Sequence, residues 1–283
     1  MRVVVLTSET PANIWLVNQL LARHDVAGIV VERRPVAQTA RQKRDRRRAM
    51  FRRYGAVRTI NKLAFNWVRS RLLAASESTI IRESFFPAGV APAYARPVPT
   101  CVVADVNARA ALDFIGDRAA DVLAVCGTTV LKPDVFTKTP LGAINIHTGI
   151  TPEYRSADPI FWALYRGEPE KVGVTIHYID RGIDTGPIVH QEAVPVYADD
   201  SLATIYVRCI RRGAELYSQT LLEIENGTVR AERRRGVPDR AFRSIDLGLF
   251  QYLVFRQRFR RLVSTRRRGR GGAPGAAATE TQQ

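Results

Sequence analysis

The sequence predicts an α/β fold in which a doubly wound, mainly parallel sheet carries helices on both faces. Short, continuously apolar runs alternate along the chain with stretches whose apolar residues recur at helical spacing. Continuous apolar runs are typical of parallel strands, because both faces of such a sheet are covered. Ligands of these sheets bind beyond the carboxyl ends of the strands, so the residues that end each strand are the first candidates for a functional site.

A β-α-β unit opens the chain, with a strand at 2–7, a helix at 12–24 and a strand at 26–31. A basic segment then interrupts the alternation, which resumes at about residue 101. Further strands are expected at 101–106, 121–126, 143–147, 173–179 and 187–196, and further helices at 108–115, 159–165 and 201–225.

Two basic segments account for the net charge of +16. Residues 33–71 hold 14 Lys/Arg and one acid, and residues 247–272 hold 8 Arg and no acid. The rest of the chain is mildly acidic, so the overall charge does not by itself indicate a nucleic-acid or membrane partner. We expect a core domain at 1–196 interrupted by a basic helical insertion at 33–75, a short C-terminal helical extension at 197–263 and a disordered tail at 264–283.

Neither a disulfide framework nor a metal site is expected. The three cysteines, at 101, 126 and 209, are far apart and odd in number, and the histidines show no metal-ligand spacing. No apolar run approaches the roughly 18 residues of a membrane helix, and the short apolar start is followed by no cleavage site. These features predict a cytoplasmic protein.

Asn145 and His147 end one of the predicted strands. Residues two apart leave the same face of a strand, so the amide and the imidazole project together where a ligand would bind. Downstream, Asp184 lies in a turn between Gly182 and Gly186, which lets the chain fold back. The sequence therefore predicts that an amide, an imidazole and a carboxylate meet at one strand end.

Asn145, His147, Pro152 and the turn at 183–187 resemble the N10-formyltetrahydrofolate-dependent formyltransferase family in order and spacing. The likeness is close over residues 141–196 and weaker back to the N-terminus. It implies a Rossmann-like catalytic domain at residues 1–196 that moves a formyl group from 10-formyltetrahydrofolate, the co-substrate, to the amine of a small-molecule acceptor. No metal is implied.

The resemblance also implies a role for each polar group. Asn145 would donate its amide N–H, and protonated His147 would donate a proton, to the oxygen that gains negative charge. Asp184 would orient the imidazole and favour its charged form, and would take part in proton removal from the amine through water. His24, His177 and His190 are interpreted as structural residues of a helix end and of strands.

The same resemblance places the folate on two segments. One follows the predicted strand at 121–126 and the other is the turn that closes over the ring. The alternative for the first segment is a tight strand-to-helix turn in which Gly127 is needed only for its backbone. The expected co-substrate contacts are Cys126, Gly127, Thr128, Thr129, Leu131, Ile179, Asp180 and Gly182.

Three residues are candidates for acceptor binding: Asn13, Arg155 and Asp158. Asn13 is what remains of the first-loop pattern of the glycinamide ribonucleotide branch. A solvated loop residue is the alternative for Arg155, and a helix N-cap is the alternative for Asp158.

Departures from the family pattern bear on the acceptor. The first loop, 7–13, has no glycine but contains Glu9 and Pro11, which argues against the phosphate of glycinamide ribonucleotide. The resemblance implies that the methionyl-tRNA branch adds a C-terminal barrel to the catalytic domain. Only about 60 potentially ordered residues follow Val196, which argues against methionyl-tRNA as the acceptor. The usual His-Pro-Ser-Leu-Leu-Pro reads His-Thr-Gly-Ile-Thr-Pro at 147–152. A nucleotide-linked amino sugar is the favoured acceptor. Hydrolysis of the formyl group of 10-formyltetrahydrofolate to formate, without an amine acceptor, is a further alternative.

A different class of function is an RNA- or membrane-surface-binding protein with an inactive formyltransferase-like core. Its contacts would run through 33–75 and 250–270, where aromatic residues lie among arginines. The alternative is that these aromatics pack the two segments onto the core and leave a solvated basic face. The aromatics concerned are Phe51, Tyr54, Phe65, Trp67, Phe250, Tyr252, Phe255 and Phe259.

Overall fold

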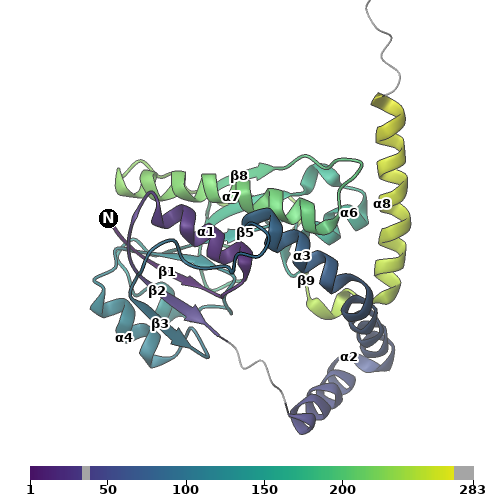
Figure 1. The fold of residues 1–283 in the computed structure, drawn as a ribbon, viewed down its shortest axis with the longest axis horizontal. Helices are drawn as coiled ribbons and strands as arrows, with labels where there is room; N and C mark the ends of the chain where they lie inside the picture. Colours follow the sequence, from purple (N-terminus) through teal and green to yellow (C-terminus); the bar gives the residue numbers. More distant parts are fainter. Residues whose placement is uncertain (34–38, 271–283) are drawn as a thin grey trace, which may run out of the picture.

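The structure, a computed structural model, describes residues 1–33 and 39–270. A seven-stranded sheet lies at its centre (Figure 1). Its strands are β1 (Arg2–Thr7), β2 (Asp25–Glu32), β3 (Thr100–Val103), β4 (Val122–Cys126), β5 (Ala143–His147), β7 (Gly173–Tyr178) and β8 (Ile188–Ala193). Their order is β3-β2-β1-β4-β5-β7-β8, parallel from β3 to β5 and antiparallel from β5 to β8. The predicted mainly parallel α/β fold is confirmed.

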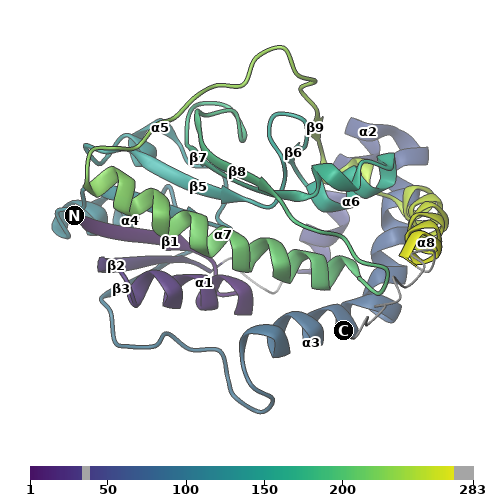
Figure 2. The same ribbon diagram turned by 90° about the horizontal axis from the view of Figure 1, so that it is seen from above.

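Helices cover both faces of the sheet. On one face α1 (Pro11–Leu21) and α7 (Leu202–Glu225) pack on the strands, and Figure 2 shows α7 lying along the sheet beside α1. On the other face lie α4 (Arg109–Asp117) and α5 (Pro133–Phe136). Successive side chains of a strand point to opposite faces, so neighbouring β1 residues enter different clusters of apolar side chains.

The basic insertion is helical, as expected, but it is longer than the predicted 33–75. It comprises α2 (Ala40–Val68), a π-helical turn η1 (Arg69–Leu73) and α3 (Ala74–Phe85). Gly55, with φ of 76°, kinks α2 into two arms. A positive φ suits glycine because it has no Cβ, so this residue sets the kink.

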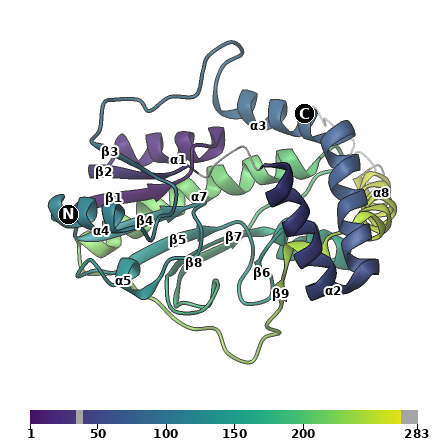
Figure 3. The same cartoon turned by 90° about the horizontal axis from the view of Figure 1, so that it is seen from below.

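A long helix, α8 (Leu249–Arg270), follows at the C-terminal side. It runs past residue 264, where the disordered tail was expected to begin, and residues 271–283 lie outside the described part of the chain. All three ribbon views place α8 and α2 together at one end of the molecule (Figures 1, 2 and 3). None of the helices within residues 1–33 and 39–270 has the length and apolar character needed to span a bilayer.

A third apolar cluster joins these helices to the core. It contains Phe65 of α2, Phe255 of α8 and the apolar side of α6 (Pro159–Arg166). The rings of Phe161 and Phe255 lie 4.9 Å apart, and those of Phe65 and Tyr252 lie 5.4 Å apart. Part of the aromatic set therefore packs inward, as one of the two interpretations of these segments expected.

Small elements escaped prediction. The two-residue strands β6 (Arg155–Ser156) and β9 (Ala241–Phe242) pair with each other, and short 3-10 turns occur at η2 (Pro169–Lys171) and η3 (Ser244–Asp246). Such short elements show no periodicity in sequence. Their pairing holds the loop after β5 in place.

Tyr217 of α7 connects the helix to the strand ends that carry the candidate site. Its side chain is fully buried, and its hydroxyl lies 3.0 Å from the carbonyl oxygen of Val125 and 2.8 Å from that of Ile144. These carbonyls belong to adjacent positions of β4 and β5, just before Cys126 and Asn145.

We expect Tyr217→Phe to lower the free energy of unfolding by about 1–2 kcal/mol, because the buried carbonyls lose their donor and no water can replace it. Urea denaturation followed by circular dichroism measures the change. Tyr178→Phe is the matched control, since the hydroxyl of this half-buried tyrosine makes no hydrogen bond within the described residues. Equal stability of wild type and Tyr217→Phe would show that the hydroxyl contributes nothing.

Candidate active site

The end of β5 presents Asn145 and His147 on one face. In the antiparallel pairing with β7, Asn145 lies directly opposite His177 and His147 lies opposite Thr175. Directly opposed residues of neighbouring strands share a face, so His177 joins the pair. The amide nitrogen of Asn145 is 3.3 Å from Nε2 of His177.

Asp184 completes the cluster from the turn after β7. One carboxylate oxygen lies 3.5 Å from Nδ1 of His147 and the other lies 3.5 Å from Nε2 of His177. The backbone N–H of Ser156 donates to the carboxylate at 2.9 Å. The structure thus brings together Asn145, His147 and Asp184, which the sequence placed at one strand end, and adds His177.

The turn that carries Asp184 is fixed by hydrogen bonds. Asp180 accepts from the backbone N–H of Gly182 at 3.0 Å and from the hydroxyl of Thr185 at 2.6 Å, and it pairs with Arg233 at 2.7 Å. Asp184 itself has φ of 52°, a left-handed conformation that aspartate tolerates better than most residues. The network holds the carboxylate between the two histidines.

Both ring nitrogens of His147 face acceptors. Nε2 lies 2.9 Å from the carbonyl oxygen of Tyr154, and Nδ1 faces the Asp184 carboxylate. Only the protonated imidazole donates from both nitrogens. The structure thus engages both ring nitrogens of His147.

Burial alone would raise the pKa of Asp184, but neighbouring groups outweigh it. The charge of His147, the hydrogen bond from His177 and the backbone N–H of Ser156 together hold the pKa of Asp184 below its usual range. Asp184 is therefore ionised at neutral pH. One of its oxygens faces the imidazole of His147 and the other faces that of His177.

Gly149 stands where the usual family motif has serine, and its surroundings leave no room for a side chain. A Cβ at this position would lie 2.5 Å from Cβ of Pro159, 2.6 Å from the carbonyl oxygen of Tyr154 and 2.7 Å from Nε2 of His147. Any larger residue would displace the imidazole or the carbonyl that it contacts. The peptide bond between Thr151 and Pro152, a little further on, is cis.

The segment 126–131 lies beside the strand ends. The Cys126 thiol donates to the hydroxyl of Thr7 at 3.1 Å, and Gly127 has φ of 72°. The backbone N–H of Thr129 donates to the carboxylate of Glu32 at 2.8 Å. Thr128 and Thr129 line an open hollow of about 600 Å³, while Leu131 is buried in the apolar cluster against which Ile179 packs.

The three acceptor candidates lie in different settings. The amide of Asn13 donates to the Ser8 hydroxyl at 3.0 Å, so it ties the first loop together. Arg155 forms a bidentate pair with Asp239 and donates to the carbonyl oxygen of Ile183 at 3.0 Å. Asp158 makes no capping hydrogen bond to α6, although it precedes that helix. Asp158 lines a cavity.

That cavity, of about 480 Å³, lies between the core and the inserted helices. Thr148 and Asp158 line it from the loop after β5, and Phe65, Arg69 and Tyr252 line it from the helices. Burial raises the pKa of Asp158 above its ordinary value, although the positive charges of Lys62 and Arg69 oppose the shift. A carboxylate among mostly apolar walls can hold a positively charged group of a ligand.

Sequence reasoning missed two residues of this site. His177 was interpreted as an ordinary strand residue, and only the register of β7 against β5 reveals its contact with Asn145. Glu32, buried at the end of β2, anchors the loop after β4 and gave a weak signal as a lone acid that ends an apolar strand.

We expect Asp184→Asn to lower the free energy of unfolding at pH 7 by about 1–3 kcal/mol, because a charge-assisted set of hydrogen bonds is lost. The folded pKa of Asp184 lies below its ordinary value of 3.8. Its contribution is therefore full above about pH 4 and is lost as the pH falls through the folded pKa. Urea denaturation between pH 3 and pH 8 should show a constant difference down to about pH 4 that begins to narrow towards pH 3; a difference that narrows already above about pH 5 would contradict the assignment.

A family described as formyl transferase matches residues 1–221. Methionyl-tRNA formyltransferase of Pelotomaculum thermopropionicum is 37% identical over 112 residues, which are 40% of this chain and 36% of the relative. That of Chlorobium chlorochromatii is 31% identical over 151 residues, which are 53% of this chain and 45% of the relative. The chain thus matches less than half the length of these curated relatives.

Solved structures show the same fold. Glycinamide ribonucleotide transformylase 1 from Symbiobacterium toebii has a TM-score of 0.53 at 19% identity, covering 82% of this chain and 94% of its own. A sugar N-formyltransferase from a Shewanella species has a TM-score of 0.54 at 13% identity, covering 92% and 87%. The family match extends over well over half of the sequence and includes every residue of the cluster described above. The chain belongs to the formyl transferase family.

Proposed function

We propose that this chain transfers a formyl group from 10-formyltetrahydrofolate to the amino group of a small-molecule acceptor. The observation that carries the proposal is the convergence of Asn145, His147 and an ionised Asp184 at the end of β5. An amide donor, a doubly donating imidazole and a carboxylate suit acyl transfer to an amine. Family membership supports the same reaction.

10-Formyltetrahydrofolate supplies the formyl group. As the acceptor amine forms its bond to the formyl carbon, the formyl oxygen gains negative charge. Asn145 donates to it, and protonated His147 donates to it through Nε2 once that N–H leaves the carbonyl oxygen of Tyr154. The bond from that carbon to N10 then breaks. N10 takes up one proton, and the amine loses one, with Asp184 assisting its removal through water.

His177 acts as a positioning residue in this scheme. Its Nδ1 lies 2.8 Å from the carbonyl oxygen of Tyr178, and its Nε2 faces Asp184 and Asn145. The ring thereby holds the carboxylate that orients His147. It contacts no position where a reacting atom would lie, so its effect is indirect.

The residues around segment 126–131 fit a folate ring held by main-chain groups. Glu32 fixes the backbone of Thr129, whereas the N–H and C=O of Leu131 make no hydrogen bond within the described residues. Those two groups are available to a ring that carries both donors and acceptors. Across from them, the Asp180 network would keep the turn closed.

Asp158 is the acceptor contact that the cavity favours. Its carboxylate would hold the acceptor amine near the reacting centre, since Thr148 of the same cavity follows His147 directly. Arg155, by contrast, is engaged by Asp239 and by the carbonyl of Ile183. We assign it to bracing the turn that carries Asp184 rather than to binding the acceptor.

A nucleotide-linked amino sugar is the acceptor that we favour. The cavity holds about 480 Å³ and has the aromatic side chains Phe65, Tyr206 and Tyr252 in its walls, which suit a flat base. At the first loop, Thr10 caps α1 and Pro11 lacks an N–H, while Glu9 adds a negative charge paired with Arg33. That loop therefore offers a poor site for a substrate phosphate.

The proposal is tested by incubating the protein with 10-formyltetrahydrofolate and a panel of amines. The panel contains several nucleotide-linked amino sugars, glycinamide ribonucleotide and methionyl-tRNA, and mass spectrometry identifies which gains a formyl group. Formylation of an amino sugar alone supports the proposal in full. Free formate without acceptor would indicate hydrolysis, and no turnover with any amine would favour an inactive core.

We expect His147→Ala to lower the turnover number at least ~100-fold, because a proton donor to the oxyanion is lost. His177→Gln should cause a smaller loss and should also change the pH profile, since it loosens Asp184. His190→Gln is the matched control, because His190 pairs with Glu223 away from the site. Rates are measured on variants whose circular dichroism matches wild type; a near-normal rate for His147→Ala would refute its role.

We expect Asp158→Asn to raise the KM for the acceptor about tenfold, equivalent to ~1.4 kcal/mol, because the amine loses a charged partner. The KM for 10-formyltetrahydrofolate should stay the same. Asp113→Asn, on the opposite face of the sheet, serves as the control. Parallel changes in both KM values would argue that Asp158 shapes the loop rather than binding the acceptor.

A further inference from the structure

Large apolar side chains stand exposed on the inserted helices and on α8. They include Val57, Ile60, Trp67, Leu72, Phe250 and Leu253. Val57 is 83% exposed, Trp67 63% and Leu253 55%. Large apolar side chains gathered on neighbouring exposed helices mark a place where something binds. We call these six side chains and the arginines among them the α2–α8 surface.

The second arm of α2 has a buried side and an exposed apolar side. Thr59, Lys62 and Phe65 point into the protein and are buried. Val57, Ile60 and Trp67, which are three and seven residues apart, line the opposite side and face solvent. Packing on the core therefore accounts for one side of this helix only.

Helix α8 repeats the arrangement. Tyr252 and Phe255 pack inward, while Phe250 and Leu253 face solvent. Asn61 fixes the two helices to each other, because its amide donates to Gln251 at 2.8 Å and accepts from the backbone N–H of Phe250 at 2.9 Å. The exposed residues of α2 and α8 thus lie on a joined pair of helices.

The α2–α8 surface is also strongly basic. Within the described residues, Arg52, Arg58, Arg71 and Arg256 form no ion pair with a carboxylate. Unpaired guanidinium groups leave a positive potential that attracts an anionic partner.

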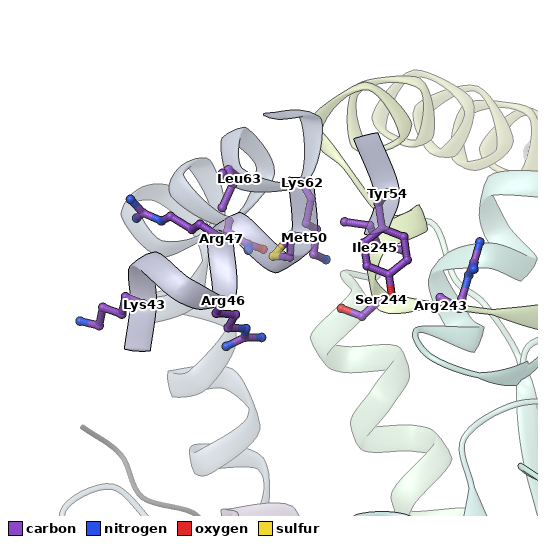
Figure 4. Close-up of a pocket in the computed structure, with 11 residues that line it drawn as sticks. Lys43, Arg46, Arg47, Met50, Tyr54, Lys62, Leu63, Arg243, Ser244 and Ile245 are labelled. Carbon is purple, nitrogen blue, oxygen red and sulfur yellow. The ribbon is translucent and has the colours of Figure 1, made fainter. Parts of the chain in front are cut away.

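A cavity at the same end of the molecule is also lined by cationic side chains. It has a volume of about 440 Å³ and lies between the arms of α2 and the chain before α8 (Figure 4). Five cationic side chains line it, namely Lys43, Arg46, Arg47, Lys62 and Arg243. Lys62 is buried, and the ammonium makes no hydrogen bond or ion pair within the described residues.

We propose that the α2–α8 surface docks on an anionic lipid bilayer. Arginines meet the lipid phosphates, and Trp67, Ile60 and Leu253 enter the boundary between headgroups and acyl chains. Basic helices that carry exposed Trp, Phe and Leu are suited to lie in the plane of that interface. The inference does not rest on the proposed function.

Other partners match the surface less well. RNA would satisfy the arginines and stack on Trp67, but it offers nothing to aliphatic side chains such as Val57 and Leu253. A second copy of the chain would bring two positively charged faces together. Of these three partners, a bilayer alone complements both the charge and the aliphatic residues.

Intrinsic fluorescence provides the first test. Of the three tryptophans, Trp162 is buried and Trp15 is partly buried, so Trp67 reports on the surface. Vesicles of phosphatidylglycerol should shift the emission to the blue, and brominated acyl chains should quench it. Trp67→Phe should abolish this spectral response. An unchanged spectrum at lipid concentrations that sediment the protein would overturn the insertion of Trp67.

Co-sedimentation with vesicles provides the second test. Binding should be at least tenfold tighter to phosphatidylglycerol than to phosphatidylcholine vesicles and should weaken as salt is raised. Ile60→Gln and Leu253→Gln should each weaken it several-fold, whereas Leu222→Gln, at a residue 46% exposed on α7, should not. All three positions are exposed, so we expect the variants to fold, and thermal unfolding checks this.

Three outcomes would overturn the proposal. One is binding to vesicles that the two glutamine variants leave unchanged. Another is binding of single-stranded RNA, equally by wild type and variants, without any binding to vesicles. The third is a concentration-dependent dimer, seen by sedimentation velocity, that Ile60→Gln disrupts.

Discussion

The ionised carboxylate of Asp184 is the interaction on which the candidate site depends. Burial works against its charge, and the charge persists because His147, His177 and the N–H of Ser156 all point at it. Each partner comes from a different part of the chain, namely β5, β7 and β6. One charge therefore links side chains of β5 and β7 with the backbone of β6. Behind it, Arg155 donates to the carbonyl oxygen of Ile183 and Asp180 accepts from the N–H of Gly182, which fixes the turn that carries Asp184.

Much of the core could be predicted from sequence because its signal is local. Continuous apolar runs gave the strands that end at Cys126 and His147 at their observed positions, since burial on both sheet faces leaves few polar residues. The meeting of Asn145 and His147 follows from the two-residue period of a strand. The role of His177 could not be predicted in this way. It depends on which residue of β7 lies opposite Asn145, and register is a property of the pair of strands.

The acceptor side resisted prediction for a related reason. The walls of the 480 Å³ cavity come from α1, α2, α3, α6, α7 and α8, and no short motif joins them. Asp158 was predicted as an acceptor contact because it follows the strand that ends at His147, but Phe65 and Tyr252 were interpreted only as packing or surface residues. Their position depends on how the insertion and α8 fold back on the core. Packing through a few aromatic rings fixes that geometry, and it leaves no periodic trace.

The two basic helices also show why a single interpretation of such segments fails. Aromatic residues among arginines were expected either to pack inward or to face a partner, and they do both. Phe65 and Phe255 secure the helices to the core, whereas Trp67 and Phe250 remain exposed. The inner sides of the helices line the cavity beside the candidate active site, and the outer sides form the α2–α8 surface. If that surface rests on a bilayer, the cavity lies within one helix diameter, about 10 Å, of the lipid headgroups. An acceptor that carries its own lipid anchor would then reach Asp158 without leaving the membrane surface.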